Sequence, residues 1–228
     1  MQKTKVIVIG GPTASGKTRL SIELAKKIDG EIVSADSMQI YKEMNIGTAK
    51  PDNEEMQGIK HYMLDIISPD SRFSVANYKE QAKQAIQEII DKGKVPIVIG
   101  GTGLYIETLI YEIEFPKIEI DLEYRKKLEE IANEKGLEYL YDKAMQIDKS
   151  AMEKISKNDK KRILRVLEIY HQTGKTKSEL EEKSRKEPEY NYKLFAIDMD
   201  REILYERINK RVDIMLENRI NWRSTSYM

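Results

Sequence analysis

The sequence contains no cysteine, which excludes disulfide bonds and metal sites with cysteine ligands. It also lacks a long apolar run, because the stretch from Val6 to Ile9 is too short for a secretory signal or a membrane span. Neither sign of charge is in excess, since 39 lysines and arginines balance 39 acidic residues. We therefore expect a cytoplasmic protein without a membrane partner, in which any RNA is held by a local patch.

Histidines are few, and the thirteen tyrosines and the single tryptophan are scattered along the chain. His61 and His171 have no metal-ligand spacing, and Trp222 is the only tryptophan. The sequence therefore predicts no histidine-ligated metal site and no aromatic platform for stacking bases.

A phosphate-binding loop is the clearest motif that is present. The segment GGPTASGKT follows the apolar run and has the spacing Gly11-x-x-x-x-Gly16-Lys17-Thr18. Glycines let backbone N–H groups point inward, Lys17 can reach terminal phosphates, and the Thr18 hydroxyl can bind a Mg²⁺ that bridges phosphate oxygens. An amphipathic helix should follow, closed by Gly30. The motif predicts a bound phosphate without identifying the molecule that carries it.

Short apolar segments alternate with amphipathic ones over residues 1–116, which predicts a parallel sheet covered by helices. The expected strands are 5–9, 31–35 and 95–99, with a helix at 75–92, and residues 192–198 should rejoin the sheet. Residues 117–187 are rich in lysine and glutamate and predict helices, either as an insertion or as surface helices of the same domain.

The predicted fold class is therefore α/β, a P-loop NTPase-like parallel sheet core flanked by helices, with a helical insertion domain. The core is expected at 1–116, the insertion at 117–187, and the return to the core at 188–228.

Three polar loops follow the expected strands: the phosphate loop, residues 36–39 and residues 100–103. Because ligands of parallel sheets lie beyond the carboxyl ends of the strands, these loops should form one site. Asp36 suits either Mg²⁺ binding or abstraction of a proton, although an aspartate in this position also often caps a turn.

A basic segment lies within residues 156–174. Ser156 or Asn158 should cap a helix that Gly174 ends, with cations on one side of its first turns. The plain interpretation of such a face is that it is solvated.

The phosphate loop alone leaves several enzyme classes open. A GTPase is excluded because the guanine-reading Asn-Lys-x-Asp motif is absent, and Asn209-Lys210-Arg211-Val212-Asp213 places its aspartate one residue too late. A small-molecule kinase needs the same loop, an aspartate base and a few arginines, so it is the alternative.

Four segments in order carry a more specific signal: GPTASGKT, SADSMQIYKEMNIGTAKP (residues 34–51), VIGGTGLY (residues 98–105) and NDKKRILRVLEIY (residues 158–170). Together they resemble the tRNA dimethylallyltransferases over most of residues 3–217. The resemblance implies transfer of a dimethylallyl group from dimethylallyl diphosphate to the exocyclic amine of the adenine just 3′ of the anticodon. It also implies Mg²⁺ as cofactor, with Thr18 as its ligand, and a monomeric enzyme.

The resemblance further implies roles for individual residues. Asp36 would be the general base, with Lys17 and Thr18 completing the catalytic set. The diphosphate would be bound by Gly11, Pro12, Thr13, Ala14, Ser15, Gly16, Lys17, Thr18 and Arg211. The tRNA would contact Asp36, Ser37, Met38, Gln39, Thr102, Arg125, Lys161, Arg162, Ile163, Leu164 and Arg165, which gives the basic helix face a function.

The chain departs from the family in two places. Lys161 stands where the family commonly has glutamine, and the last ten residues, RINWRSTSYM, do not resemble the family's glycine-leucine-rich continuation. Plausible codons for this segment, read one base later, encode a family-like sequence. We therefore expect a chain truncated by a frameshift, with apolar surface left exposed and either reduced transfer activity or only residual binding of RNA or diphosphate.

Overall fold

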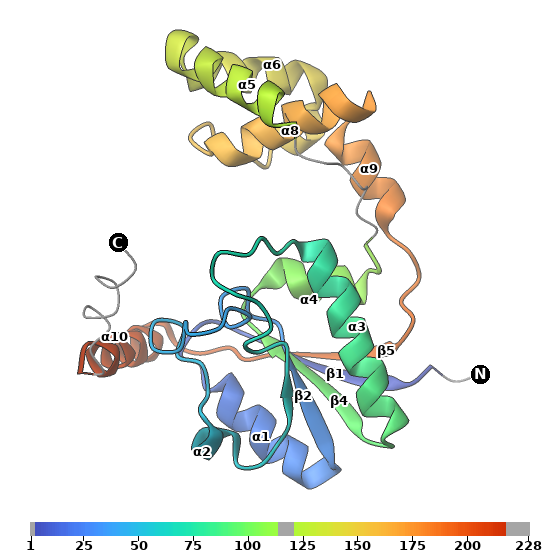
Figure 1. Ribbon diagram of the computed structural model, residues 1–228, viewed down its shortest axis with the longest axis vertical. Coiled ribbons are helices and arrows are strands. Elements are labelled where there is room, and N and C mark those ends of the chain that lie inside the picture. The colour runs from blue at the N-terminus through green and yellow to red at the C-terminus, as the bar shows by residue number, and fades with distance from the viewer. Residues whose placement is uncertain (1–2, 114–120, 218–228) are drawn as a thin grey trace. The chain divides into compact units, whose positions relative to one another are not determined.

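The computed structural model describes residues 3–113 and 121–217 (Figure 1). The predicted boundary at residue 116 and the divergent C-terminal segment lie outside these residues. The chain divides into two compact units, one of Met1–Glu112 with Glu187–Met228 and one of Ile113–Lys186. We refer to the first as the core unit and to the second as the helical unit.

The core unit is built on a sheet of five parallel strands in the order β3-β2-β4-β1-β5. The strands are β1 (Lys5–Gly10), β2 (Gly30–Ser34), β3 (His61–Tyr62), β4 (Val95–Gly100) and β5 (Asn191–Ala196). The prediction of a parallel sheet that the last strand rejoins is therefore confirmed. The sequence analysis missed β3, because two residues are too few to show a periodic pattern.

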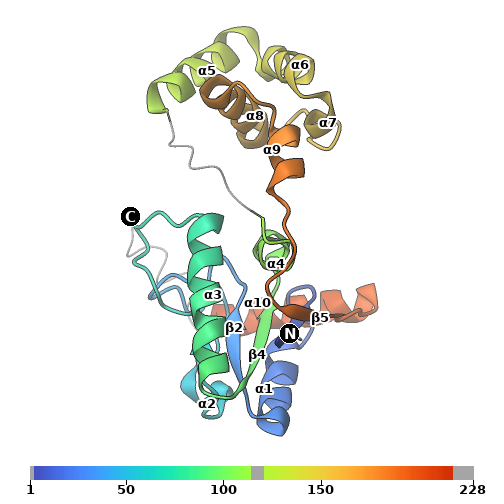
Figure 2. The ribbon, with the colours of Figure 1, turned by 90° about the vertical axis from the view of Figure 1, so that its right-hand side faces the viewer.

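Helices cover both faces of the sheet. The core helices are α1 (Lys17–Ile28), α2 (Asn53–Met56), α3 (Val75–Asp91), α4 (Gly103–Ile110) and α10 (Arg201–Glu217). α3 and α1 lie on opposite sides of the strands (Figure 2). Val6, Val33 and Val98 pack with α3 and α4 in one apolar cluster, whereas Ile32 and Ile97 pack with α1 in another. The central strands β1, β2 and β4 are thus apolar on both sides, as a covered parallel sheet requires.

The end of α1 differs from the expectation. Asp29, not Gly30, takes the left-handed cap conformation, with φ of 51°. Gly30 is already the first residue of β2, where a Cβ would lie 2.9 Å from the Val95 carbonyl oxygen and from Ile97. The glycine is needed for this close approach between strands and not for ending the helix.

The helical unit contains α5 (Leu122–Lys135), α6 (Leu137–Ile147), α7 (Lys149–Met152), α8 (Lys160–Thr173) and α9 (Lys177–Ser184). It has an apolar cluster of its own, which includes Leu128, Leu140, Ile163 and Leu167. The cap of α8 is Asp159, whose carboxylate accepts a hydrogen bond from the Arg162 backbone, and not Ser156 or Asn158. Gly174 ends this helix with φ of 65°, as expected.

Apolar side chains are exposed on the last two elements of the core unit. Leu194 and Phe195 on the edge strand β5 are 55% and 59% exposed. On α10 no residue is buried, and the half-buried positions, Leu204, Ile208, Arg211 and Met215, repeat every three or four residues. This spacing places Arg211 within the inward-facing stripe of the helix. No helix in the described parts of the chain has the length and apolar character needed to cross a bilayer.

The half-buried ring of His61 predicts a pH dependence of stability. Its Nδ1 lies 2.9 Å from the Ile59 carbonyl oxygen and must donate to it, while its Nε2 is buried without a hydrogen-bond partner in the described residues. Burial lowers the pKa of His61, and the bond to Ile59 opposes this only in part. The unfolded chain therefore binds the proton more readily, so stability is complete above the ordinary histidine pKa of about 6.5 and decreases as the pH falls below it.

We expect the free energy of unfolding to decrease more between pH 7.5 and pH 5.5 for this chain than for its His61→Gln variant, which has no titrating ring. Urea unfolding at a series of pH values measures both. Parallel pH profiles for the two proteins would contradict the expectation.

Candidate active site

The phosphate loop lies between β1 and α1, at the carboxyl end of a central strand. Gly16 caps α1 with φ of 88°, a left-handed conformation that favours glycine. No side chain caps this helix, so its first N–H groups are free of side-chain acceptors. The hydroxyl of Ser15 is buried without a hydrogen-bond partner in the described residues. Backbone donors, an unpaired hydroxyl and the positive end of the helix dipole together suit an anion.

Lys17 folds over the loop from the first turn of α1. Its Nζ donates to the carbonyl oxygens of Gly11 at 2.8 Å and Pro12 at 2.6 Å. Burial lowers the pKa of Lys17; the negative charge of Asp36 opposes this shift and the positive charge of Arg211 adds to it. These three side chains are therefore close enough to interact electrostatically.

Asp36 begins the loop that follows β2. Its Oδ1 accepts hydrogen bonds from the backbone N–H of Met38 at 2.9 Å and of Gln39 at 3.3 Å. This is the turn-capping role that the sequence analysis weighed against a chemical one. Only one carboxylate oxygen makes these bonds, so the second oxygen is available for chemistry.

Thr102 joins the loop of residues 100–103 to the loop of residues 36–39. Its hydroxyl oxygen accepts from the Ser37 backbone at 3.0 Å, and its own N–H donates to the Ala35 carbonyl at 3.1 Å. A Cβ added to Gly100 would lie 2.1 Å from that same carbonyl oxygen, so only glycine allows this approach. The structure thus brings residues 36–39 and Thr102 together.

Gln39 is held by the protein itself. Its Nε2 donates to the carbonyl oxygens of Thr48 at 3.2 Å and Ala49 at 3.4 Å, and its Oε1 accepts from Ser34 at 3.3 Å. The side-chain amide therefore fixes residues 48–49, and contact with a base would require it to exchange these bonds.

Two arginines of α10 approach the same loops. Arg211 donates from Nη2 to the Thr48 carbonyl at 3.0 Å, and its Nε is buried without a partner in the described residues. Burial lowers the pKa of Arg211, while Asp36 and Glu55 oppose this. Arg207, one turn earlier, brings Nη1 within 3.9 Å of a Cβ built on Gly16. Lys17, Arg207 and Arg211 therefore lie around the loop, with Asp36 and Glu55 close enough to Arg211 to act on its charge.

A cleft of about 720 Å³ opens beside these residues, within the size range of small-ligand sites. Thr13, Asp36 and Arg211 contribute polar atoms to it, and Met38 lines it with a side chain that is 48% exposed. Residues 43–48 and the inward stripe of α10 supply much of the remaining wall. The phosphate loop, the predicted base and the predicted diphosphate arginine therefore share one cleft.

A metal at this site would find few protein ligands. The described residues contain no group of three or more histidine, aspartate or glutamate side chains able to hold a cation. Thr18 and Asp36 each offer an oxygen atom, which fits a Mg²⁺ bound mainly through a ligand's phosphates and water.

In the helical unit, a buried carboxylate organises two of the predicted RNA contacts. Glu168 on α8 is 1% exposed and accepts from Arg125 Nε at 2.6 Å and from Arg125 Nη2 at 3.0 Å. Arg165 Nη1 reaches the same carboxylate at 3.4 Å. Two arginines share one glutamate, so this cluster carries a net positive charge.

The family relationship follows from comparison with known proteins. A family model described as IPP transferase matches residues 39–220. The tRNA dimethylallyltransferase of Acetivibrio thermocellus is 60% identical over 213 residues, which cover 93% of this chain and 68% of the relative. The chain belongs to the tRNA dimethylallyltransferase family.

Solved structures agree with this assignment. A tRNA delta(2)-isopentenylpyrophosphate transferase from Staphylococcus epidermidis is 46% identical, with a TM-score of 0.60 over 95% of this chain and 70% of that one. A eukaryotic dimethylallyltransferase acting on tRNA is 34% identical, with a TM-score of 0.81 over 98% of this chain and 56% of that one. The predicted P-loop NTPase-like α/β class is confirmed, and these relatives do not favour the kinase alternative.

The side chains of two residues that the resemblance assigned to tRNA contact are buried. Ile163 and Leu164 are 0% and 4% exposed and pack in the apolar cluster of the helical unit. Their side chains contribute to the packing of that cluster, and a tRNA contact at these positions stays a prediction that only the backbone could fulfil. Lys161 and Arg162 are exposed on the same helix, and Arg162 pairs with Asp159 at 3.3 Å.

Three structural features at these two places were not predicted from the sequence. Glu168 looked like one acid among many, although its position three residues after Arg165 placed it on the same helix face. Arg207 precedes Arg211 by one turn, a spacing that indicates a shared face. His171 received no role, yet its ring stacks on Tyr124 with centroids 3.7 Å apart.

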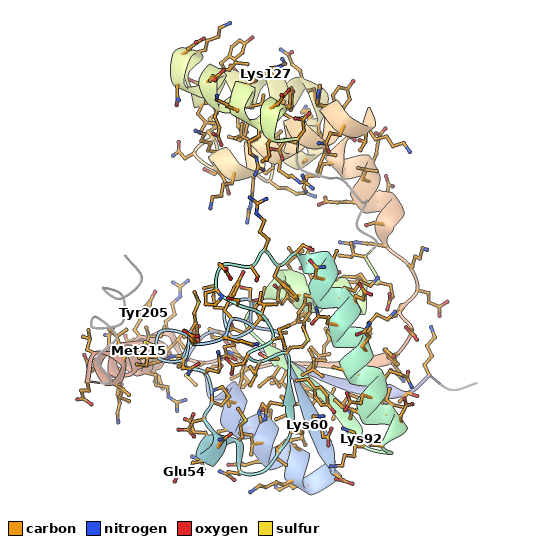
Figure 3. The ribbon with its side chains drawn as sticks, viewed as in Figure 1. Glu54, Lys60, Lys92, Lys127, Tyr205 and Met215 are labelled. Carbon is orange, nitrogen blue, oxygen red and sulfur yellow. The ribbon has the colours of Figure 1, made fainter. Side chains whose placement is uncertain are left out.

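Removal of Arg125 should destabilise the helical unit. Arg125→Ala leaves the buried Glu168 carboxylate with only the longer contact to Arg165, so we expect the free energy of unfolding to fall by about 1–3 kcal/mol. Lys127→Ala is the matched control, because Lys127 is exposed on the same helix (Figure 3). Hydrogen exchange of α8 amides measures both variants, and equal exchange rates would show that the pair contributes no stability.

Proposed function

We propose that this chain transfers a dimethylallyl group from dimethylallyl diphosphate to the exocyclic amine of the adenine just 3′ of the anticodon in tRNA. The observation that carries the proposal is that the phosphate loop, Asp36 and Arg211 meet at one cleft. The relatives named tRNA dimethylallyltransferase support this reaction as the one that the cleft catalyses.

The reaction breaks one carbon–oxygen bond and forms one carbon–nitrogen bond. The electron pair of the broken bond leaves with pyrophosphate, the adenine nitrogen attacks the allylic carbon, and that nitrogen then loses a proton. The amine is a weak nucleophile because its lone pair is delocalised into the ring. The protein must therefore stabilise the leaving group and accept the proton.

The phosphate loop and Arg211 can bind the pyrophosphate leaving group. The N–H groups at the start of α1 and the side chains of Lys17 and Arg211 supply positive charge beside the phosphate loop, where negative charge would develop as the carbon–oxygen bond breaks. The two carbonyl contacts of Lys17 can be exchanged for phosphate oxygens by rotation of its long side chain.

Asp36 can act as the general base. Its Oδ1 is engaged by the turn, which fixes the carboxylate, and the other oxygen can accept the proton from the amine. Mg²⁺, held by Thr18 and the diphosphate, would neutralise charge on the leaving group when bound.

We assign tRNA binding to positively charged side chains of the helical unit and to residues of the core site. Arg125, Lys161, Arg162 and Arg165 offer the local patch that a chain without net charge needs for RNA. The target adenine must leave the base stack to reach the cleft, which costs a few kcal/mol, and anticodon loops make this cheaper than a duplex does. A monomeric enzyme in the cytoplasm is part of the proposal.

A transfer assay tests the function. Purified chain, radiolabelled dimethylallyl diphosphate, Mg²⁺ and an anticodon stem-loop should give labelled RNA. The matched control RNA carries purine in place of the adenine and lacks the accepting amine, so it should stay unlabelled. Labelled control RNA, or no transfer while RNA and diphosphate still bind, would contradict the proposal; the second result would identify a binding remnant.

The Asp36→Asn variant separates the proposed role of Asp36 as a base from its role in the turn. Asparagine keeps the oxygen that accepts from Met38 and Gln39, whereas it cannot take a proton from the amine. We expect transfer to slow by about 10²–10⁴-fold, with affinity for the stem-loop unchanged within a few fold. Single-turnover kinetics and RNA binding by fluorescence anisotropy measure the two quantities. Turnover equal to that of the unchanged chain would remove Asp36 as the base.

A further inference from the structure

The helical unit carries two stacked aromatic rings, one from the first turn of α5 and one from the last turns of α8. The rings of Tyr124 and His171 have centroids 3.7 Å apart and planes that differ by 9°. The two helices pack side by side, as both views of the ribbon show (Figure 1 and Figure 2). We refer to Tyr124 and His171 as the ring pair. The sequence analysis did not predict it, because its members come from different helices and meet only in the folded unit.

Tyr124 is the inner member of the ring pair. It is half-buried and packs against the apolar cluster of the helical unit. Burial raises the pKa of Tyr124, and the negative charge of Glu168 adds to this shift. The phenol therefore lies close to the carboxylate that binds Arg125 and Arg165. Packing on one side and the stacked ring on the other fix Tyr124 as a support for His171.

His171 is the outer member of the ring pair, and its side chain is 48% exposed. Because Tyr124 covers one face of the imidazole, the exposed part comprises the opposite face and the ring edge. The Asp121 carboxylate lies at that edge, 3.9 Å from Nε2. The ring pair thus offers a flat surface to solvent, and histidine is one of the side chains on which RNA bases stack.

A fixed guanidinium lies beside the ring pair. Arg125 follows Tyr124 in the chain, and its Nε and Nη2 are bound by the Glu168 carboxylate, which holds the guanidinium in one plane. The Arg125 side chain is 35% exposed, and Nη1 takes no part in this pairing, so it can donate to a phosphate. Glu168 precedes His171 by three residues on α8, which places the arginine and the rings on the same face.

Positive charge continues along this face of α8. Lys161, Arg165, Glu168 and His171 follow one another at spacings of three or four residues, so they share one side of the helix. The stripe from Lys161 to His171 is about 15 Å long, which is enough to contact more than one nucleotide. Cations next to an exposed ring are the combination that binds single-stranded nucleic acid, since the phosphates need the charge and the bases need the ring.

We propose that the ring pair stacks on one unpaired base of the anticodon arm, while Arg125 binds the phosphate next to that base. The inference rests on the proposed function for RNA as the partner. It adds a second base contact, because the accepting adenine goes to the cleft of the core unit whereas the ring pair belongs to the helical unit. The base must be unpaired, since the faces of a paired base are covered by its neighbours in the stack.

RNA binding measured without dimethylallyl diphosphate tests the inference apart from catalysis. Fluorescence anisotropy compares the unchanged chain with His171→Ala and His171→Phe. We expect His171→Ala to weaken stem-loop affinity by about tenfold or more, and His171→Phe, which keeps an aromatic ring, to stay within about threefold of the unchanged chain. A fully paired duplex with the same number of phosphates offers no unpaired base, so its affinity should be equal for all three proteins.

The salt dependence of binding separates stacking from a phosphate contact. Loss of one phosphate contact reduces the slope of log affinity against log salt concentration by about 0.7–0.9, whereas loss of a stacked base leaves this slope unchanged. His171→Ala should therefore give a line parallel to that of the unchanged chain.

The matched control is Tyr139→Ala. Tyr139 is an aromatic residue of the same unit, is 45% exposed and lies beside a cation, Lys135, whose Nζ is 5.0 Å from the ring centroid. It belongs to α6, which carries none of the predicted RNA contacts, so its removal should leave stem-loop affinity unchanged. Hydrogen exchange of α8 amides reports whether each variant keeps the helical unit folded.

If His171→Ala accelerates that exchange, His171→Leu replaces it, because leucine still covers Tyr124 and has no aromatic face. A fluorescent purine analogue, whose emission falls when its ring is stacked, is then placed at each loop position in turn. At one position other than the accepting adenine, binding should lower the emission with the unchanged chain and with His171→Phe, but not with His171→Leu.

Four results would overturn the inference: unchanged stem-loop affinity in His171→Ala, an equal loss in His171→Phe, an equal loss for the paired duplex, or a reduced salt slope. The last two would assign His171 to the RNA backbone. Transfer that proceeds without any dependence on His171 would remove the ring pair as an RNA contact and leave the proposed function standing. Base stacking without transfer would do the reverse.

Discussion

The contact on which the site depends is the backbone approach of Gly100 to Ala35. A single added methyl group would lie 2.1 Å from the Ala35 carbonyl oxygen, so the ends of β2 and β4 meet only because residue 100 has no side chain. The Ala35 carbonyl then accepts from Thr102, and the Thr102 hydroxyl accepts from Ser37. Through these bonds two separate loops become one surface beside the phosphate loop.

The site brings three cations together at the phosphate loop. Lys17, Arg207 and Arg211 lie around this loop, Asp36 lies beside them, and the negative charge of Glu55 also acts on Arg211. The cations and the N–H groups at the start of α1 favour an anion. In the helical unit Glu168 is shared by two arginines with the same consequence. A chain with no net charge thus concentrates positive charge at two places, one in each unit.

The sequence predicted the features that repeat or that depend on near neighbours. Apolar runs located β1, β2, β4 and β5, and glycine spacing located the phosphate loop, because both patterns act over a few residues. It failed for β3, which has only two residues, and for the cap of α8, where Asp159 competes with Ser156 and Asn158. The sequence does not show which of several neighbouring capping residues begins a helix, because that depends on the backbone conformation.

The sequence by itself determined the family, the α/β core and the identities of Lys17, Asp36 and Arg211 as residues with the right chemistry. Tertiary structure alone decided which of these side chains meet, that Gln39 is already bound to residues 48–49, and that Ile163 and Leu164 are buried. It also showed that residues 43–48 and α10 line one cleft, although Thr48 and Arg211 are separated by 163 positions in the sequence. Local patterns carry no information on such separations, because the distance between those parts is set by the packing of the whole core unit.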